Sequence, residues 1–460
     1  IGSTTVAAHL CNLRTGEVLA SAGMMNPQIR FGEDLMSRVS YVMMHPDGDS
    51  EMTKVIRKTI NELAENVAAK ANRQLNEIVE VTFVGNPIMH HLLLGINPLE
   101  LGGAPFALAT DESVRIRARD LNLTLHTNTR CYVLPCIAGH VGADTAGMIL
   151  SEAPHKREAI TLLVDIGTNA EIVLGNKERL LAASSPTGPA FEGAQITCGQ
   201  RAAPGAIERV RIDRKTLEPK FKIIGCDLWS DETGFSKQTK KTGITGICGS
   251  GIIEAIAEMY LAGVLTQDGV INGSFAEKSE RIVSEDRTFS YILHDGEQHI
   301  HISQNDVRAI QLAKAALYAG IRLLMERLGI ESVDRIRLAG AFGNHIEPKF
   351  AMILGLIPDC NLKQVSSAGN AAGTGARIAL LNHESRNEIE EVVRQVEKVE
   401  TAVETNFQQH FVNAMALPHK IDKFPNLAKE VELPADNMSE NTYENATPTA
   451  KRRRRKTTNS

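Results

Sequence analysis

Apolar residues follow two different spacings along this chain. Short apolar runs at 78–84 and 333–338 predict strands, because a buried strand needs only a few consecutive apolar residues. At 51–76 and 305–328 apolar residues recur every three or four positions, which predicts helices. Predicted strands and helices alternate in this way through most of the sequence. The alternation indicates an α/β fold with mixed sheets and flanking helices.

Two segments of the chain have similar sequences. Residues 1–7, IGSTTVA, have a counterpart in residues 165–171, DIGTNAE. Each segment predicts a tight glycine-containing turn that opens a β-hairpin. Because one copy lies in each half of the chain, the repeat indicates a duplicated protein with two lobes.

The apolar pattern divides the chain into four parts. We expect a first lobe at 1–157 and a second at 158–385. The valine-rich stretch 386–418 begins with a predicted amphipathic helix that reaches Val403, and its helices should pack on the body. Residues 419–460 lose this spacing and gain Asn, Thr, Glu and Pro, which predicts a disordered tail with a basic end.

Composition and charge exclude several classes of protein. The 460 residues are 43% hydrophobic with a net charge of −5, which is typical of a globular chain without a general attraction to nucleic acid. The basic run at 451–456 has no interleaved aromatic residues, so a solubilising tail is favoured over a nucleic-acid site. No apolar run is long enough to span a membrane, and seven scattered cysteines indicate reduced thiols. We therefore expect a cytoplasmic protein.

The repeated turn carries groups that suit a triphosphate. Asp165 ends a predicted strand and can hold hydrated Mg²⁺, Gly167 lets the backbone approach, and Thr168 offers a hydroxyl. The other members of the two turns are Gly2, Ser3, Thr4, Thr5 and Asn169. Short Gly-Thr turns also occur in plain hairpins, so it is the presence of two copies that favours a nucleotide-binding phosphate clamp.

A third segment of small residues follows the predicted strand at 333–338. Gly340, Ala341, Gly343 and Asn344 belong to a predicted turn against which a flat base can lie. Taken alone, this pattern is also typical of a tight crossover from a strand to a helix.

Asp144 opens a predicted helix between the two repeated turns. A carboxylate in this place can orient a water near the γ-phosphate, so we regard Asp144 and Asp165 as the candidate catalytic residues. An acidic residue in the first turn of a helix is equally well explained by the helix dipole. Glu192 is a weaker acidic candidate, for which a structural role in its loop is favoured.

The two turns and the late Ala-Gly-Ala segment, in this order, resemble the phosphate-1, phosphate-2 and adenosine segments of the acetate and sugar kinase, heat-shock chaperone and actin superfamily. Within it, about residues 1–418 resemble the ATP-dependent reductive activators of corrinoid proteins. The most specific string is Gly-Pro-Ala-Phe-Glu-Gly at 188–193. The other strings lie at 26–28, 31–34, 84–86, 201–207 and 338–344.

The resemblance implies an actin-like, ribonuclease H-like ATPase with Mg and ATP in the cleft between two lobes. It also implies an activity, in which a corrinoid protein of a methyltransferase system that has lapsed to Co(II) is returned to Co(I). An electron donor would act through an N-terminal ferredoxin-like 2Fe-2S domain. A homodimer is left open, and neither a membrane nor a nucleic acid is an expected partner.

The chain departs from this family in two respects. It opens inside the first turn motif, so we take it as the remainder of a longer protein; the Asp expected before Ile1 lies outside the sequence. The cluster domain is absent as well. Cys131 and Cys136 have the first interval of a plant-type cluster, but the next ligand position is Gly139, so we expect two buried thiols there.

Two other functions are kept as alternatives. A small-molecule kinase of the same superfamily would need a sugar- or carboxylate-binding string with a base, and no clear one is found. An ATP-gated binding module like the chaperones would need a substrate-binding domain. The residues after Pro418 are too polar to form one.

Overall fold

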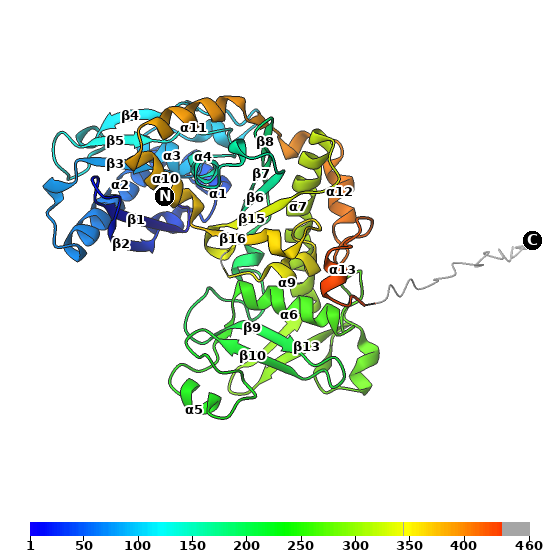
Figure 1. The fold of residues 1–460 in the computed structure, drawn as a ribbon. Coiled ribbons are helices and arrows are strands. Elements are labelled where there is room, and N and C mark those ends of the chain that lie inside the picture. The colour runs from blue at the N-terminus through cyan, green and yellow to red at the C-terminus, as the bar shows by residue number, and fades with distance from the viewer. Residues whose placement is uncertain (344, 435–460) are drawn as a thin grey trace, which may run out of the picture.

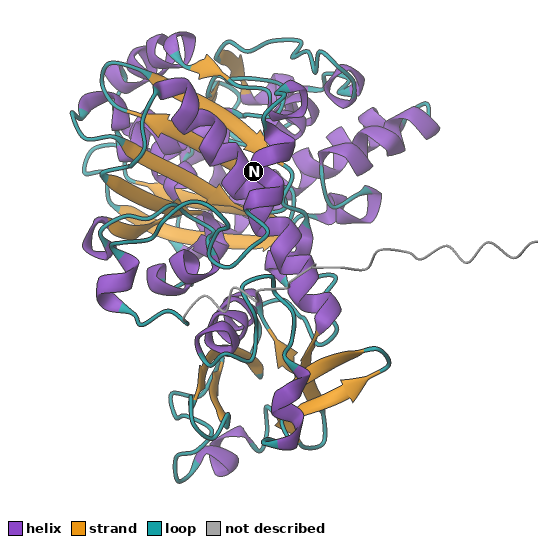
Figure 2. Cartoon of the chain, turned by 90° about the vertical axis from the view of Figure 1, so that its right-hand side faces the viewer, coloured by secondary structure: helices purple, strands orange, loops and turns teal. Residues whose placement is uncertain are grey.

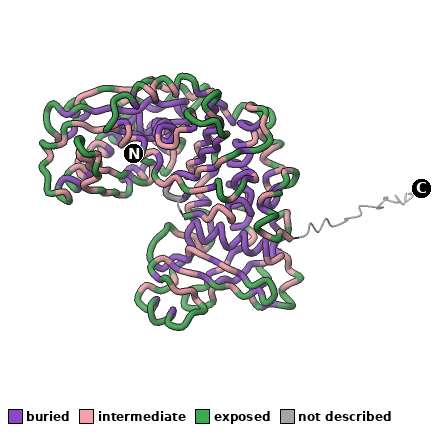
Figure 3. Tube along the Cα trace, viewed as in Figure 1, coloured by how far each residue is buried: buried purple, intermediate pink, exposed green. Residues whose placement is uncertain are grey.

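The computed structural model of the chain describes residues 1–343 and 345–434. Figure 1 shows an N-terminal lobe in blue and cyan, a central region built around a long sheet, and a green region below it. Strands and helices are interleaved in the upper part of Figure 2, and buried residues run through the middle of each region in Figure 3. Among the described residues, no helix combines the length and apolar character needed to cross a bilayer.

A six-stranded mixed sheet forms the centre of the molecule. Its strands are β6 (Thr161–Ile166), β7 (Ala170–Gly175), β8 (Leu180–Ser185), β15 (Arg335–Ala339), β16 (Val365–Gly369) and β17 (Glu397–Lys398). The spatial order is β16-β15-β6-β7-β8-β17, and β7 runs antiparallel to its two neighbours while the other pairs are parallel. Leu162 and Val164 of β6 enter one hydrophobic core and Leu163 enters another, so both faces of the sheet are covered.

Helices cover the two faces of the central sheet. They are α4 (Ala143–Glu152), α7 (Gln304–Leu328), α8 (Gly340–Gly343), α9 (Pro348–Leu354), α10 (Ala371–Leu381) and α11 (Glu384–Gln395). The long helix α7 starts at a capping box in which Ser303 and Asp306 each accept a bond from the other's backbone N–H. The sheet and its helices confirm the predicted α/β architecture.

The green region of Figure 1 is inserted between β8 and α7. It holds two three-stranded sheets, in the orders β10-β9-β11 and β12-β13-β14. Its elements are β9 (Ala206–Ile212), β10 (Pro219–Ile223), α5 (Phe235–Thr239), β11 (Gly246–Ile247), α6 (Gly249–Leu261), β12 (Ile282–Glu285), β13 (Thr288–Asp295) and β14 (His299–Ser303). Residues of both small sheets and of α6 join the same hydrophobic core as one face of the central sheet.

The first lobe contains a small mixed sheet and a separate two-stranded ribbon. A three-stranded sheet has the order β3-β5-β4, and β1 and β2 form an antiparallel ribbon. The strands are β1 (Thr5–Cys11), β2 (Val18–Met25), β3 (Glu80–Phe83), β4 (Val114–Arg117) and β5 (Arg130–Val133). The helices are α1 (Leu35–Met44), α2 (Gly48–Lys70) and α3 (Pro87–Leu94).

Helices α4 and α10 cross at very short range. A Cβ atom built on Gly375 of α10 would lie 1.9 Å from the carbonyl oxygen of Gly147 in α4. A Cβ atom on Gly147 would lie 2.9 Å from the carbonyl oxygen of Ala372. Only glycine leaves room for two backbones at this separation. The crossing therefore joins the last helix of the first lobe to the helix that follows β16 of the central sheet.

The predicted amphipathic helix that reaches Val403 is too long. Helix α11 ends at Gln395, and the chain then adds β17 to the edge of the central sheet, parallel to β8. The backbone N–H of Val399 donates to the carbonyl of Ala182 at 2.9 Å. The free edge of β8 offers backbone hydrogen bonds that the helical spacing of the valines does not reveal.

The prediction of a disordered tail from residue 419 is wrong for residues 419–434. Two short helices, α12 (Phe407–Asn413) and α13 (Leu427–Glu430), lie in the C-terminal part of the chain. The buried side-chain nitrogen of Lys314 in α7 donates to the carbonyls of Ala416 at 2.5 Å and Pro418 at 2.7 Å. The Tyr318 hydroxyl donates to Asp422 at 2.9 Å, so α7 supplies polar anchors that replace the missing apolar pattern. Residues 435–460, with the basic run, lie outside the described part of the chain.

Replacing Gly375 by alanine is expected to destabilise the fold by about 1–3 kcal/mol, because the added methyl group forces α4 and α10 apart. Urea unfolding of the variant measures the loss. The exposed neighbour Thr374 supplies the control, since Thr374→Ala should change the free energy of unfolding by less than about 0.5 kcal/mol. Equal stability of the two variants would contradict a close helix crossing.

Candidate functional site

Side chains from two other segments hold the first predicted phosphate turn. Within the turn, the N–H of Gly2 donates to the carbonyl of Thr5 at 3.0 Å. The Asn26 amide donates to the carbonyl of Gly2 at 2.9 Å, and the Asn86 amide donates to the hydroxyl of Ser3 at 2.8 Å. Asn26 and Asn86 both belong to strings on which the family resemblance rests, so these strings supply side chains that hold the first turn in place.

A buried arginine supports the same turn from α1. The Arg38 guanidinium donates to the carbonyl of Ser3 at 2.6 Å and to that of Gly32 at 2.9 Å. Burial lowers the pKa of Arg38 to about 10, which still leaves it charged at neutral pH. The backbone N–H of Asn26 also donates to the carbonyl of Thr4 at 2.8 Å. The carbonyl groups of the turn are thus satisfied by protein.

The second predicted turn directly follows β6. The N–H of Gly167 donates to the carbonyl of Asn169 at 3.1 Å, and the Thr187 hydroxyl donates to the carbonyl of Gly167 at 2.8 Å. The Thr168 hydroxyl donates to the Glu192 carboxylate at 3.0 Å. Glu192 thereby ties the Gly-Pro-Ala-Phe-Glu-Gly string to this turn.

Three carboxylates gather where the two lobes meet. Asp165 and Glu171 are directly opposite each other in the β6–β7 hairpin, so their side chains share one face of the sheet. Asp144 lies in the first turn of α4, where its carboxylate accepts the N–H of Thr145 at 2.8 Å. All three side chains are partly exposed. Sequence reasoning assigned roles to Asp144 and Asp165 but missed Glu171.

Burial raises the pKa of all three groups, and repulsion from neighbouring carboxylates adds to this effect at Asp165 and Glu171. Burial, with a smaller contribution from the charge of Asp144, raises the pKa of Asp165 to about 7. Burial also places the pKa of Glu171 well above its usual range, and the charges of Asp144 and Asp165 add to this effect. The pKa of Asp144 is raised by burial. The cleft therefore holds more acid groups than it can keep ionised without a cation.

The predicted adenosine segment is helical where a turn was expected. Gly340 starts α8 with φ +83°, and a Cβ atom on it would lie 2.2 Å from a carboxylate oxygen of Asp165. Its lack of a side chain lets the end of β15 touch that carboxylate. Ala341 continues the helical turn, and Gly343 packs against the backbone of Leu338. Asn344 lies outside the described residues, and contact with a base stays a prediction.

One cavity connects the predicted site residues of the two lobes. It has a volume of about 570 Å³, and Gly2, Thr5, Asp144 and Asp165 are among its lining residues. The structure thus brings the first turn together with the carboxylates of α4 and β6. The residues Ser3, Thr4, Gly167, Thr168, Asn169 and Glu171 do not line this cavity.

The carboxylates fit a hydrated divalent cation. Their oxygen atoms are the ligands that Mg²⁺ prefers, and a cation would relieve the repulsion that raises their pKa. Within residues 1–343 and 345–434, no three His, Cys, Asp or Glu side chains converge closely enough to ligate a metal directly. This geometry suits Mg²⁺ that keeps its own waters and contacts Asp165 through one of them.

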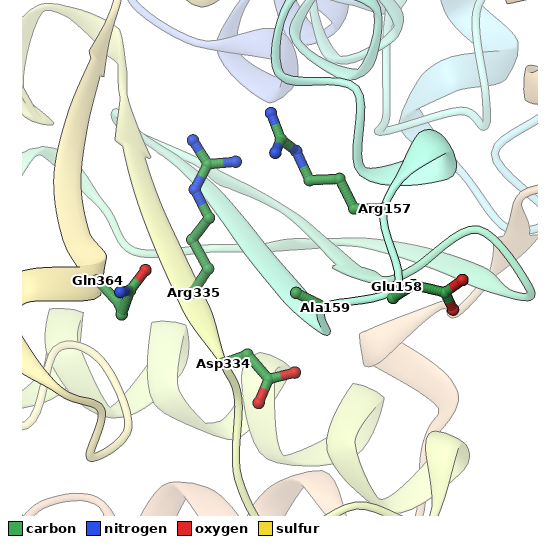
Figure 4. A pocket seen from close by; sticks show the side chains of 6 residues that line it. All are labelled: Arg157, Glu158, Ala159, Asp334, Arg335 and Gln364. Atoms are coloured by element: carbon green, nitrogen blue, oxygen red, sulfur yellow. The ribbon is translucent and has the colours of Figure 1, made fainter.

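A second hollow lies at the opposite end of β6 and β15. Its volume is about 770 Å³, and Figure 4 shows its lining residues, with the guanidinium groups of Arg157 and Arg335 pointing the same way. Arg335 is paired with Glu152 at 3.5 Å. β6 starts at this end and finishes at the carboxylates, so the hollow is separate from the cleft.

The cysteines of the first lobe do not fit an iron–sulfur cluster. Cys131 and Cys136 are buried, and burial raises the pKa of the Cys131 thiol to about 12. The pKa of Cys136 is raised as well, also by burial. A cluster needs thiolate ligands, so these neutral thiols behave as small apolar side chains.

Comparisons with known proteins agree with this geometry. Residues 1–157 match the model of the RACo middle region, and residues 159–428 match that of the C-terminal domain of RACo, the ASKHA domain. The corrinoid activation enzyme RamQ of Eubacterium limosum is 35% identical over 428 residues, with 90% of this chain and 69% of RamQ aligned. A [Co(II) methylated amine-specific corrinoid protein] reductase of Methanosarcina barkeri is 24% identical, with 86% and 72% aligned.

A solved structure supports the same assignment. The reductive activator for corrinoid, iron-sulfur protein superposes with a TM-score of 0.78 and is 34% identical, and the match covers 91% of this chain. This chain spans 65% of the length of that activator. The fold is therefore the predicted actin-like ATPase fold, of the ASKHA class. The chain belongs to the RACo family of corrinoid-protein activators and carries its middle and ASKHA regions.

The raised pKa of Asp165 predicts how the stability of the nucleotide-free protein depends on pH. Because the folded pKa is above that of the unfolded chain, the stabilising contribution is complete below pH about 4 and is lost as the pH rises through about 7. Asp165→Asn removes this loss. We expect the free energy of unfolding of this variant, minus that of the wild type, to be ~1–2 kcal/mol larger at pH 8 than at pH 5.

Urea unfolding at both pH values measures this difference. Glu158→Gln alters an exposed carboxylate just before β6 and should leave the pH dependence of the wild type unchanged. If the difference in the free energy of unfolding between Asp165→Asn and the wild type is the same at pH 5 and pH 8, Asp165 titrates normally in the folded protein.

Proposed function

We propose that this chain is the nucleotide-binding part of a cytoplasmic, ATP-dependent activator that returns a corrinoid protein from Co(II) to Co(I). The observation that carries the proposal is the acid-lined cleft between two regions that both match the RACo family. Two relatives are named for corrinoid activation and for reduction of a Co(II) corrinoid protein. The partner would be a corrinoid protein of a methyltransferase system.

The two turns and the carboxylates would share the binding of Mg-ATP. The Gly2–Thr5 turn of the first lobe and the Gly167–Asn169 turn of the second present backbone N–H groups and hydroxyls for phosphate oxygens. Asp165 would hold Mg²⁺ through water. The bound Mg²⁺ supplies positive charge that offsets the charge of the phosphates. Gly340, Ala341, Gly343 and Asn344 would lie beside the adenosine.

Asp144 and Glu171 would have different roles beside a bound nucleotide. Asp144 starts α4 between the two turns, which suits a residue that orients an attacking water. Glu171 faces Asp165 across the hairpin, and the charge of Asp165 helps to raise the pKa of Glu171. Alternatively, Asp144 only stabilises the helix dipole, and substitution of Asp144 distinguishes this role from the orientation of water.

Nucleotide binding would act as a conformational switch. The turns belong to different lobes, and α4 and α10 cross at the junction. A ligand that contacts both lobes favours the closed state over the open state only by as much as it binds the closed state more tightly than the open state. Such a bias in a complex with the corrinoid protein would make transfer of one electron to Co(II) favourable. That electron would come from a donor through a 2Fe-2S domain outside this chain.

Substitutions at the two aspartates test the ATP site. Asp165→Asn removes the carboxylate that holds hydrated Mg²⁺ and should weaken Mg-ATP binding by about tenfold or more, measured by titration calorimetry. Asp144→Asn should bind Mg-ATP normally and hydrolyse it about 10²-fold more slowly. Glu158→Gln is the control for both measurements. Unchanged affinity for Mg-ATP in Asp165→Asn would show that Asp165 does not belong to the site. A normal rate of hydrolysis in Asp144→Asn would show that Asp144 only stabilises the helix dipole.

Cobalt reduction tests the activity itself. A Co(II) corrinoid protein and a low-potential one-electron reductant are mixed with the chain joined to an N-terminal 2Fe-2S domain, and the cobalt absorbance is followed with and without Mg-ATP. We expect Co(I) to appear only when the chain and Mg-ATP are both present, and Asp165→Asn to abolish the effect. ATP consumption stimulated by sugars or short acids, without Co(I), would instead indicate a kinase.

A further inference from the structure

The cleft gathers negative charge, and its two phosphate turns add no side-chain cation. Asp144, Asp165 and Glu171 are acidic, while the turn residues 2–5 and 167–169 have uncharged side chains. Sites of phosphoryl transfer usually combine the metal with an arginine or a lysine, because negative charge builds on the phosphate oxygens in the transition state. A suitable cation has to reach the turns from a neighbouring segment.

Arg201 belongs to the second lobe but contacts the first. It lies on the loop between β8 and β9, and its Nη1 atom is 3.8 Å from the sulfur of Met25 at the end of β2. Met25 lies directly opposite Thr5 in the β1–β2 ribbon. Thr5 closes the first phosphate turn, because its carbonyl accepts the N–H of Gly2 at 3.0 Å. The guanidinium group is therefore next to the hairpin that carries this turn.

The loop that carries Arg201 is also joined to the second phosphate turn. Glu192 in this loop accepts the hydroxyl of Thr168 at 3.0 Å. Gly193 follows, and a Cβ atom built on it would lie 2.7 Å from the carbonyl oxygen of Gln200. Because Gln200 directly precedes Arg201, this close approach of the two backbones fixes the position of Arg201 relative to Glu192. One loop therefore links the second turn to the hairpin of the first.

A long and exposed ion pair holds the guanidinium group of Arg201. Its Nη2 atom is 3.9 Å from a carboxylate oxygen of Glu33, and the two side chains are 49% and 61% exposed. A pair of this kind contributes little to stability. A phosphate group offers arginine a charge-assisted partner that can accept two hydrogen bonds at once. Arg201 can therefore exchange Glu33 for a phosphate at small energetic cost.

Two of the strings on which the family resemblance rests meet at this ion pair. Glu33 belongs to the string at 31–34, and Arg201 opens the string at 201–207. No residue of either string lines the cleft cavity. A contact with the nucleotide would give both strings a place in the same site.

We propose that Arg201 contacts the terminal phosphate of bound ATP and offsets the negative charge that develops there during hydrolysis. The proposal rests on the proposed function, since it assigns a further residue to the same site. The predicted adenosine segment belongs to the second lobe. A triphosphate that starts there and reaches the first-lobe turn would bring its terminal phosphate to the place beside which Arg201 lies.

The chemistry of hydrolysis defines what Arg201 would do. A water oxygen bonds to the γ-phosphorus, the bond from that phosphorus to the bridging oxygen breaks, and ADP, inorganic phosphate and a proton are released. Negative charge shifts onto the bridging and terminal oxygens as that bond breaks, and a guanidinium group beside them lowers the barrier. The same contact would tie the second-lobe loop to a nucleotide held by the first lobe, and the tie would end with the loss of the γ-phosphate.

Paired substitutions separate this role from that of a structural ion pair. Arg201→Gln and Glu33→Gln each remove one partner of the same pair. Arg214→Gln is the matched control, because Arg214 is similarly exposed and also forms a 3.9 Å ion pair, with Glu432. Titration calorimetry measures the affinities for Mg-ATP and Mg-ADP, and the release of inorganic phosphate at saturating Mg-ATP measures hydrolysis.

We expect Arg201→Gln to weaken Mg-ATP binding by about tenfold, to change Mg-ADP binding by less than about twofold and to slow hydrolysis by about 10²-fold. Arg201→Lys should recover part of the rate, because it keeps the charge but not the planar fork. Glu33→Gln should bind Mg-ATP at least as tightly as the wild type, since it removes the carboxylate that competes for Arg201. Arg214→Gln should match the wild type in all three measurements.

Three results would overturn the role of Arg201. One is an equal effect of Arg201→Gln and Glu33→Gln, which would show that the ion pair is structural. The second is an equal loss of affinity for Mg-ATP and Mg-ADP in Arg201→Gln, and the third is a normal rate of hydrolysis in that variant. Failure of the proposed function has a different signature, because the wild-type chain itself would then bind no Mg-ATP, and the role of Arg201 would be lost with it.

Discussion

The close crossing of α4 and α10 is the constraint on which the arrangement of the cleft depends. Gly147 and Gly375 let the two backbones meet where any side chain would hold them apart. Asp144 lies at the start of α4, and β6 with Asp165 lies beneath the same pair of helices. If the helices were farther apart, the carboxylate of one lobe could not raise the pKa of the carboxylate of the other.

The raised pKa values of these carboxylates reflect a loss of folding stability in the ligand-free chain. The cleft brings three acidic side chains together in a partly dehydrated place, although each of them would be more stable in water. A divalent cation bound beside these carboxylates would offset the repulsion, so the same repulsion would become a source of affinity for the cation. Sites that bind charge tightly are often poorly stable when empty for this reason.

Much of the fold could be predicted from local pattern. The helix predicted at 305–328 is α7 within one residue, and the turn after Asp165 opens a hairpin as expected. Glu171 was missed because its importance comes from lying opposite Asp165, which depends on the strand register rather than on any motif. The two-residue strand β17 was missed because its hydrogen bonds go to β8, more than 200 positions earlier. Local spacing carries no information about such distant partners.

The position of β17 has a consequence for how the molecule behaves in a crowded solution. An open strand edge is a template on which other chains can assemble, and proteins commonly cover it. By laying residues 397–398 along β8, the chain closes that side of its largest sheet with a segment of its own. The C-terminal segment thus works as a guard against aggregation as well as a support for α7, and a molecule that lost it would expose β8 to its neighbours.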